Sequence, residues 1–279
     1  MTKILDGKVA AETINQDLKK RVQKLQKQNI TPCLAVILVG NDPASKIYVE
    51  RKEAAAREIG IKTQTYTFEQ TLSEEQLLNC IQELNQNSSI HGILVQFPLP
   101  KHIDEAKVVR MINVEKDVDA FHPMNVGYLV EGFPKLTPCT PTGIMELLKM
   151  NQIDVSGKHC VVVGRSSIVG KPMSLMLLQN NATVTICHSK TQNLETLTKQ
   201  ADIIVLAIGK ANYLQPNMIK DGVILIDVGM NRTNSGLVGD IDAKCYSKAS
   251  WYTPVPGGVG PMTIAMLMKQ TVEIAERGK

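Results

Sequence analysis

The sequence has few aromatic residues and no long apolar segment. Phe, Trp and Tyr make up only 4% of the 279 residues. A nucleic-acid-binding module needs stacking aromatics interleaved with a basic patch, and neither is present. No run of about eighteen uncharged apolar residues occurs, and the N-terminus meets charge at Lys3 and Asp6 without an apolar signal region. We therefore expect a soluble, unexported protein that binds no nucleic acid and no membrane.

The sequence also lacks closely spaced cysteines. Its six cysteines include no C-x-x-C pair, and several stand inside apolar runs. This pattern is typical of reduced, mostly buried thiols in a cytosolic protein. The six are Cys33, Cys80, Cys139, Cys160, Cys187 and Cys245.

Several catalytic motifs are missing. There is no G-x-S-x-G elbow and no H-E-x-x-H, and Gly164 and Gly170 stand one residue too far apart for a Walker-type phosphate loop. The five histidines do not pair at metal-ligand spacing, so we predict no metal.

Composition and charge are those of an ordinary globular protein. With 43% hydrophobic and 21% charged residues, the chain has the length for one large domain or two modest ones. The net charge of +4 is spread along the sequence, which suits an anionic small molecule better than a nucleic-acid backbone.

Apolar runs alternate with helical patterns throughout the chain, which predicts an α/β fold. In the first third we expect strands at 33–39, 62–68 and 93–95, a helix at 43–59 and another behind the capping box that begins at Ser73. In the second half, the spacing of four short apolar runs predicts a Rossmann-like, doubly wound parallel sheet. These runs cover residues 160–163, 184–187, 203–208 and 223–228.

Proline and glycine punctuate residues 122–141, where we place the domain boundary. The last helix, at about 261–277, follows a flexible run and is expected to return to the first domain. The expected division is residues 1–120 with 262–279 in one α/β domain, and 121–261 in the second.

A glycine-bounded turn joins the strand that ends at Val163 to a helix near Pro172. Glycines let main-chain N–H groups approach a pyrophosphate, and a helix N-terminus adds partial positive charge. The spacing from Gly164 to Gly170 departs from the G-x-G-x-x-G fingerprint, so a plain structural turn fits this segment equally well.

The end of the next strand, residues 187–191, lacks an acidic residue. An NAD site usually has Asp or Glu there to bind the ribose hydroxyls. Ser189, Lys190 and Arg165 could instead bind a ribose phosphate, which favours NADP over NAD. The alternative is a polar strand end with no ligand. His188 fits a structural residue or an adenine neighbour better than a general base.

Candidate reactive groups stand one helical turn apart or at strand ends. Tyr48 and Lys52 share one helix face. Gln96 follows a predicted strand, and Asp117 and Asp119 lie in a loop. Because ligands of open α/β sheets bind beyond the carboxyl ends of strands, a pocket between the domains could gather these groups.

Several long motifs, in order along almost the whole chain, resemble those of the bifunctional methylenetetrahydrofolate dehydrogenase/cyclohydrolases. They are residues 39–45, 48–52, 92–96, 116–119, 138–141, 164–172, 227–229 and 254–263. The resemblance implies a homodimer of two-domain subunits with folate in the cleft and NADP on the second domain. It implies oxidation of methylene- to methenyl-tetrahydrofolate with NADP⁺ and hydrolysis to 10-formyl-tetrahydrofolate, a one-carbon supply for purine biosynthesis.

The resemblance also implies roles for residues. Lys52 assists hydrolysis, and Gln96 holds and tunes Lys52. Tyr48 stacks on the folate or hydrogen-bonds near it, and Asp119 anchors the pterin ring. Further substrate contacts fall at Val95, Phe97, Pro256, Gly257, Gly258, Val259, Gly260, Pro261 and Thr263. Cofactor contacts fall at Gly164, Arg165, Ser166, Ile168, Val169, Gly170, His188, Ser189, Lys190, Thr191 and Met230.

A lysine that acts on water as a base must be partly neutral, so we expect Lys52 to be largely buried and bonded to Gln96. Two positions depart from the family pattern: Ala120 stands where many members have glycine, and Met230 where many have isoleucine. Ala120 would restrict its loop if a positive φ were needed there.

Three other interpretations stay open. The nearest is a dehydrogenase that has lost cyclohydrolase activity or one that uses NAD. The presence of Tyr48, Lys52 and Gln96 disfavours the first, and the strand end without an acidic residue disfavours the second. The second is a catalytically idle NADP-binding or sensor protein on the same scaffold. A nucleic-acid-binding module is remote.

Overall fold

The computed structural model of the chain describes residues 1–234 and 236–278. The chain divides into two compact units. Unit 1 holds residues 1–11 and 138–263, and unit 2 holds residues 12–137 and 264–279. The division differs from the expected one at residues 1–11, 121–137 and 262–263.

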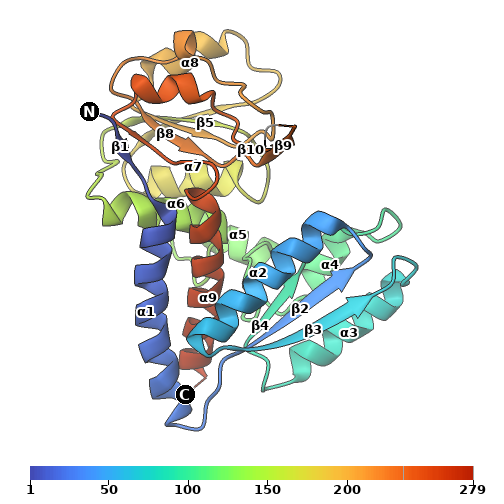
Figure 1. Ribbon diagram of the computed structural model, residues 1–279. Helices are drawn as coiled ribbons and strands as arrows, with labels where there is room; N and C mark the ends of the chain where they lie inside the picture. The colour runs from blue at the N-terminus through green and yellow to red at the C-terminus, as the bar shows by residue number, and fades with distance from the viewer. Residues whose placement is uncertain (235, 279) are drawn as a thin grey trace. The chain divides into compact units, whose positions relative to one another are not determined.

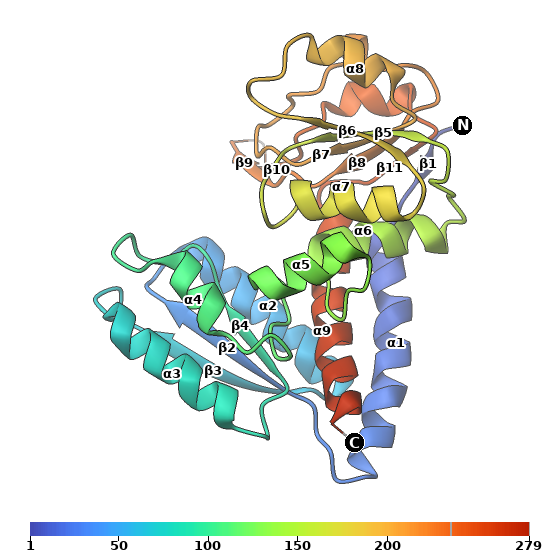
Figure 2. The ribbon, with the colours of Figure 1, turned by 180° about the vertical axis from the view of Figure 1, so that it is seen from behind.

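Unit 1 is built on a six-stranded sheet in which every pair of neighbours is parallel. Its order is β1 (Lys3–Ile4), β11 (Trp251–Tyr252), β8 (Ile224–Asp227), β7 (Ile203–Leu206), β5 (His159–Val163) and β6 (Thr183–Cys187). Figures 1 and 2 show α6 (Cys139–Met150) and α7 (Gly170–Gln179) on one face and α8 (Leu194–Gln200) on the other. The predicted doubly wound sheet is confirmed.

The strands of this sheet form where the sequence has its apolar runs. β5, β7 and β8 are almost wholly buried, because helices cover both faces of the sheet. The two-residue strand β1 joins the sheet beside β11, and the ammonium of Lys3 lies 4.9 Å from the centre of the Trp251 ring. This pairing puts the first residues of the chain in unit 1.

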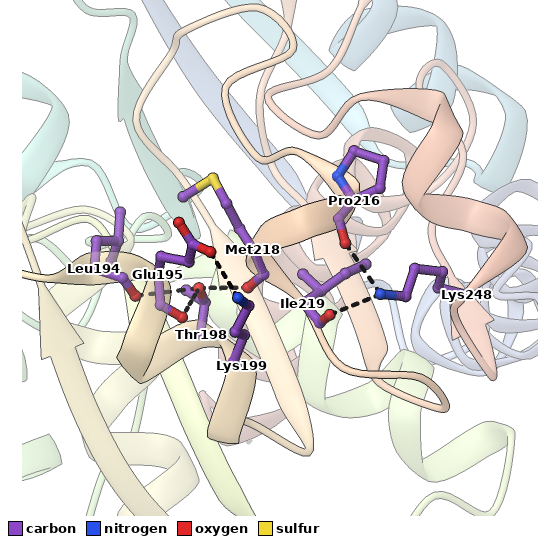
Figure 3. Close-up of polar contacts among 8 residues, drawn as sticks. All are labelled: Leu194, Glu195, Thr198, Lys199, Pro216, Met218, Ile219 and Lys248. Atoms are coloured by element: carbon purple, nitrogen blue, oxygen red, sulfur yellow. Dashed lines mark hydrogen bonds and ion pairs between the residues drawn. The ribbon is translucent and has the colours of Figure 1, made fainter.

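Polar contacts hold the 3-10 helix η1 (Pro216–Met218) against α8 and the end of η2 (Ala243–Ser247) (Figure 3). The buried Thr198 hydroxyl donates to the Met218 carbonyl at 2.6 Å. Lys248, which follows η2, donates to the carbonyls of Pro216 and Ile219 at 3.1 and 3.0 Å. A hairpin of β9 (Asn231–Thr233) and β10 (Gly236–Val238) completes the unit.

Unit 2 is built on a parallel three-stranded sheet of β3 (Lys62–Phe68), β2 (Cys33–Val39) and β4 (Gly92–Val95), in that order. Both ribbon views place α2 (Pro43–Ile59) on one face, with α3 (Glu74–Gln86) and α4 (Glu105–Met111) on the other. The predicted capping box is present, because Ser73 and Gln76 bond to each other's main chain. β2, β3 and α2 lie where the sequence predicts them, and β4 begins one residue earlier than predicted.

Two long helices, α1 (Gly7–Gln26) and α9 (Val259–Arg277), begin in unit 1, continue through unit 2 and run side by side in both views. Arg21 and Glu276 join them through two hydrogen bonds of 3.1 and 2.7 Å. The last helix therefore packs on the first domain as predicted, and it begins two residues earlier than expected. In the part of the chain that the structure describes, no helix is long and apolar enough to cross a membrane.

Residues 121–137 belong to unit 2 because α5 (Pro123–Glu131) is tied to the loop before it. The buried Asn125 amide donates to the carbonyl of Val114 at 3.1 Å and to the carboxylate of Asp117 at 3.0 Å. These bonds attach the segment that the sequence predicts as a domain boundary to the preceding loop of unit 2.

Candidate active site

Helix α2 places Tyr48 and Lys52 on one face of unit 2. The helix begins where the Asp42 side chain accepts the Ser45 N–H at 2.8 Å, and it ends at Gly60, whose φ of 88° is left-handed. Because a helical turn takes 3.6 residues, the two side chains project from neighbouring positions.

Gln96 follows β4 and meets Lys52 across 44 positions of sequence. The Gln96 main-chain N–H donates to Ile37 of β2 at 2.9 Å, which fixes the residue at the carboxyl end of the sheet. The Lys52 Nζ donates to the Gln96 Oε1 at 2.9 Å, and the Gln96 Nε2 donates to the Phe97 carbonyl at 2.7 Å. Lys52 is half-buried, rather than largely buried as expected.

Asp119 lies in the loop after Lys116, close enough to Lys52 for that ammonium to act on its carboxyl group. Burial raises the pKa of Asp119, and the positive charge of Lys52 partly offsets the rise. The loop is held by two hydrogen bonds to the residues that precede Asp119. Ile93 donates to the Lys116 carbonyl at 2.8 Å, and the Gln270 side chain donates to the Val118 carbonyl at 2.7 Å.

Asp117 supports this loop. Its buried carboxylate accepts the His122 N–H at 2.8 Å and the Asn125 amide, and burial raises its pKa to about 6. The next residue beyond Asp119, the fully buried Ala120, has a φ of 55°. We expected Ala120 to restrict its loop if a positive φ were needed there. The structure does need a positive φ at this position, and the alanine adopts it.

Unit 1 contains the glycine turn at the carboxyl end of β5. Gly164 has a φ of 141°, and a side chain at Gly170 would overlap the main chain of Gly164. The glycines therefore allow the N-terminus of α7 to pack directly against the turn. An exposed turn with a helix N-terminus at this place fits the pyrophosphate of a dinucleotide.

The Ser166 side chain bonds to the main chain at the start of this helix. Its hydroxyl oxygen accepts the N–H groups of Val169 and Gly170 at 3.1 and 3.3 Å, and its own O–H proton remains for a ligand. Arg165 and Ile168 are exposed on the same turn. A charged group and an apolar group are thus available to a bound molecule.

The turn after β6 is held by two of the predicted cofactor residues. His188 donates its main-chain N–H to the Thr191 hydroxyl at 2.8 Å, while its Nδ1 accepts the Lys190 N–H at 3.2 Å. The side chains of Ser189 and Lys190 are exposed. This arrangement leaves a hydroxyl and an ammonium for a phosphate and uses the imidazole to shape the turn.

The loop before α9 is packed too closely for side chains at its central glycine. A Cβ on Gly258 would lie 2.6 Å from the Cβ of Thr253, and Gly257 has a φ of 113°. The Thr263 hydroxyl lies 2.9 Å from that of Thr140, a contact that sequence reasoning missed although both residues lie in recognised motifs. Met230 is 38% exposed, on the loop after β8.

The structure thus gathers Lys52, Gln96 and Asp119 in unit 2. In unit 1 it gathers the glycine turn and the 188–191 turn at the carboxyl ends of the neighbouring strands β5 and β6. Residues 256–263 form a separate segment, a turn followed by the first residues of α9, on which Pro256, Gly260 and Pro261 are at least partly exposed. Among residues 1–234 and 236–278, no group of three or more His, Cys, Asp or Glu side chains could hold a metal ion.

Comparison with known proteins gives the same division of roles. Residues 5–119 match the family model "Tetrahydrofolate dehydrogenase/cyclohydrolase, catalytic domain", and residues 138–279 match the corresponding NAD(P)-binding domain. The chain is 55% identical to the bifunctional protein FolD of Acetivibrio thermocellus over 98% of this chain and 97% of that protein.

Solved structures agree. The bifunctional FolD dehydrogenase/cyclohydrolase of Campylobacter jejuni has a TM-score of 0.99 at 49% identity, covering 100% of both chains. The Trypanosoma brucei enzyme, solved with NADP cofactor and an inhibitor, has a TM-score of 0.95 at 35% identity over 99% of this chain and 98% of that one. The chain belongs to the tetrahydrofolate dehydrogenase/cyclohydrolase family.

Proposed function

We infer that the chain catalyses two consecutive reactions of one-carbon metabolism, with NADP as its cofactor. It oxidises 5,10-methylenetetrahydrofolate to 5,10-methenyltetrahydrofolate and hydrolyses that product to 10-formyltetrahydrofolate. The observation that carries this conclusion is the Lys52–Gln96 hydrogen bond beside Asp119, in a chain that matches both domains of the family.

In the oxidation the protein mainly binds and aligns. NADP⁺, when bound, accepts the hydride, and the nitrogens of the folate stabilise the cation that develops on the substrate. Alignment of two bound molecules contributes a large part of the rate for such a step. We assign the alignment of the cofactor to the glycine turn at Gly164 and Gly170 and to the N-terminus of α7.

Hydrolysis needs a group that moves a proton, and we assign this step to Lys52. A glutamine carbonyl accepts an N–H from an ammonium and, more weakly, from an amine. Gln96 therefore fixes the position of the Lys52 Nζ in either protonation state. The other N–H groups of the nitrogen, and the lone pair of the neutral amine, can bond to water. Deprotonated Lys52 takes a proton of the water as its oxygen bonds to the one-carbon unit. The bond from that carbon to N5 then breaks as N5 receives a proton, which leaves the formyl group on N10.

The remaining assignments follow the chemistry of the ligands. Pterin rings carry N–H donors, and the Asp119 carboxylate is an acceptor in a loop held by the bonds at Lys116 and Val118. Tyr48 adds an aromatic surface one turn from Lys52. Val95 and Phe97 flank Gln96. From the family resemblance we propose residues 256–261 and Thr263 as further folate contacts.

For the cofactor, we propose that Arg165, Ser189 and Lys190 bind the 2′-phosphate of NADP. All three are exposed and lie at the ends of the neighbouring strands β5 and β6. Charge-assisted hydrogen bonds from a guanidinium and an ammonium select the phosphate over the free hydroxyl of NAD. Met230 supplies an apolar contact to the nicotinamide.

The test is an absorbance assay of the purified protein with methylenetetrahydrofolate and NADP⁺ or NAD⁺, followed by the decay of added methenyltetrahydrofolate. We expect strong NADP⁺ reduction, weak NAD⁺ reduction and accelerated decay. Dehydrogenation without accelerated decay would support the monofunctional alternative. If neither activity appears, the chain is an idle scaffold and the proposal fails.

We also propose a homodimer, joined through the edge strand β6, and the cytosol as the compartment of a chain with six free thiols. Among the residues that the structure describes, β6 pairs only with β5; Ile186 of β6 is 45% exposed and Leu178 of the neighbouring helix α7 is 60% exposed. Light scattering after gel filtration should show a dimer that Ile186→Lys dissociates. Ile4→Lys, on the opposite edge strand, is the control, and an unchanged mass for Ile186→Lys would refute this interface.

A further inference from the structure

Two fully buried carboxylates lie beyond the carboxyl ends of β7 and β8 in unit 1. Asp227 is the last residue of β8, and Asp240 follows the β9–β10 hairpin. They are 1% and 0% exposed. Together they accept seven N–H donors, six from the main chain and one from the side chain of Asn231.

Asp240 holds the loop after β7 to the loop after β8. Its Oδ2 accepts the N–H groups of Ile208 and Gly209 at 2.8 and 2.9 Å. Its Oδ1 accepts the Lys210 N–H at 2.8 Å and the Asn231 amide at 2.9 Å. Each oxygen therefore has two donors, so neither position tolerates an N–H group.

Asp227 fixes Asp240 and the start of the second loop. Its Oδ1 accepts the N–H groups of Gly229 and Asp240 at 2.9 Å each, and its Oδ2 accepts Ile241 at 2.8 Å. A Cβ at Gly229 would overlap the Asp240 carboxylate, and one at Gly239 would overlap that of Asp227. The neighbouring glycines make room for the two acids.

Burial raises the pKa of Asp227 to about 6, and its three N–H bonds act against that rise. Donors surround both groups, an arrangement that stabilises the ionised form. Folding thus buries two acidic groups at this place, although an apolar core would be less costly. Stability alone is a weak reason for such a construction.

The location relates the pair to the cofactor. In an open parallel sheet, a dinucleotide lies across the carboxyl ends of the strands. The pyrophosphate turn follows β5, and the phosphate-binding turn follows β6 on one side. The loops that the pair holds follow β7 and β8 on the other side, where the nicotinamide half must lie. Met230, the proposed nicotinamide contact, stands between two residues bonded to the pair, Gly229 and Asn231.

We propose that Asp227 and Asp240 are positioning residues that hold residues 208–210 and 229–231 as one rigid seat for the nicotinamide half of the cofactor. They touch neither substrate nor cofactor and act through the main chain. This inference rests on the proposed function, because it assumes that NADP binds across the carboxyl ends of the strands of this sheet.

The test is Asp240→Asn, which keeps the shape of the side chain but sets an amide NH₂ against two N–H donors in either orientation. We expect dehydrogenase kcat/KM for NADP⁺ to fall about 10²-fold, since a misplacement near 1 Å has an effect of that size. Affinity for 2′,5′-ADP, which lacks the nicotinamide, and hydrolysis of methenyltetrahydrofolate without NADP⁺ should be unchanged. Asp202→Asn is the matched control, because Asp202 also accepts a main-chain N–H, from His159, but lies at the opposite end of the same sheet.

Unchanged NADP⁺ reduction by Asp240→Asn would overturn the proposal, and so would a parallel loss of 2′,5′-ADP binding, which indicates general damage to unit 1. If Asp240→Asn does not fold, Asn231→Ala, which removes one of the seven donors, decides by the same measurements. Failure of the wild-type protein to reduce NADP⁺ would instead contradict the proposed function.

Discussion

Arg165 is the residue on which the proposed cofactor preference depends most. It is the first side chain beyond the Gly164 turn and is exposed, and a guanidinium can bind a phosphate through two hydrogen bonds. Arg165→Ala should lower kcat/KM for NADP⁺ by about tenfold or more, the size of one lost charge-assisted bond. The value for NAD⁺ should change little.

Steady-state kinetics with both cofactors checks this prediction. Lys149→Ala is the control, because Lys149 is an exposed cation of unit 1 on α6. An equal loss with NAD⁺ and NADP⁺ would show that Arg165 does not contact the 2′-phosphate.

Ala120 is strained in a way that its side chain only just allows. Left-handed backbone costs an L-residue about 1–2 kcal/mol, and a β-branched side chain there is a genuine outlier. Ala120 is also fully buried at a φ of 55°. Ala120→Val should therefore destabilise the protein by about 2 kcal/mol or more.

Ala120→Gly should change stability by less than about 1 kcal/mol, because relief of strain offsets the loss of a buried methyl group. The midpoints of urea unfolding distinguish the two variants. A valine variant as stable as the wild type would mean that the loop adopts another backbone conformation.

At the residue scale, sequence reasoning reaches only neighbours along the chain. Helical spacing places Tyr48 and Lys52 together, but the contact of Lys52 with Gln96 joins two elements and came from the family resemblance. The Asp227–Asp240 pair was missed, because no periodic pattern links the end of a strand to a hairpin. Its one signal is that Gly229 and Gly239 stand close to the two acids in sequence.

Elements with strong local signals were predicted closely. β2 is an apolar run closed by Gly40, α2 ends at the left-handed Gly60, and α3 begins at its capping box. β1 and the β9–β10 hairpin were not predicted. A strand of two residues such as β1 carries no alternation, and its partner Trp251 is distant in sequence.

The anchoring of η1 gives a test at the level of elements. The Thr198 hydroxyl donates to the Met218 carbonyl across two segments (Figure 3). Thr198→Val keeps the shape and leaves that part-buried carbonyl without its donor, a loss of about 1–3 kcal/mol. Thermal unfolding should show the shift. Thr196→Val, at an exposed position of the same helix, should have little effect, and equal stability of both variants would refute the anchor.

The whole molecule is divided differently from the way the sequence suggested. Residues 1–11 lie in unit 1 because β1 pairs with β11, and residues 121–137 lie in unit 2 because Asn125 bonds to Asp117. Proline and glycine content indicated a connection near residues 122–141, but tertiary bonds decide to which unit it belongs.

Stability should depend on pH through His91. Burial, and then the charge of Lys116, lower the pKa of His91 below its ordinary value of 6.5. The unfolded chain therefore takes up this proton first as the pH falls, so the stabilisation is complete above 6.5 and is lost as the pH falls through the folded pKa. His91→Asn keeps an acceptor for the Cys33 N–H but cannot titrate.

Urea unfolding at a series of pH values below 7 should show a smaller loss of stability for His91→Asn than for the wild type. The comparison isolates this group, since Asp117 and Asp227 contribute equally to both proteins. Parallel pH profiles would contradict the assignment.

The measurement that tests the account most directly is the hydrolysis of methenyltetrahydrofolate by Lys52→Ala, with Lys46→Ala as a control at an exposed position of the same helix. Loss of a general base typically lowers a rate about 10²–10⁴-fold. The account predicts a loss of that size for Lys52→Ala, with NADP⁺ binding and folding retained, and wild-type rates for the control. Hydrolysis at the wild-type rate by Lys52→Ala would contradict the claim that this lysine carries the second reaction.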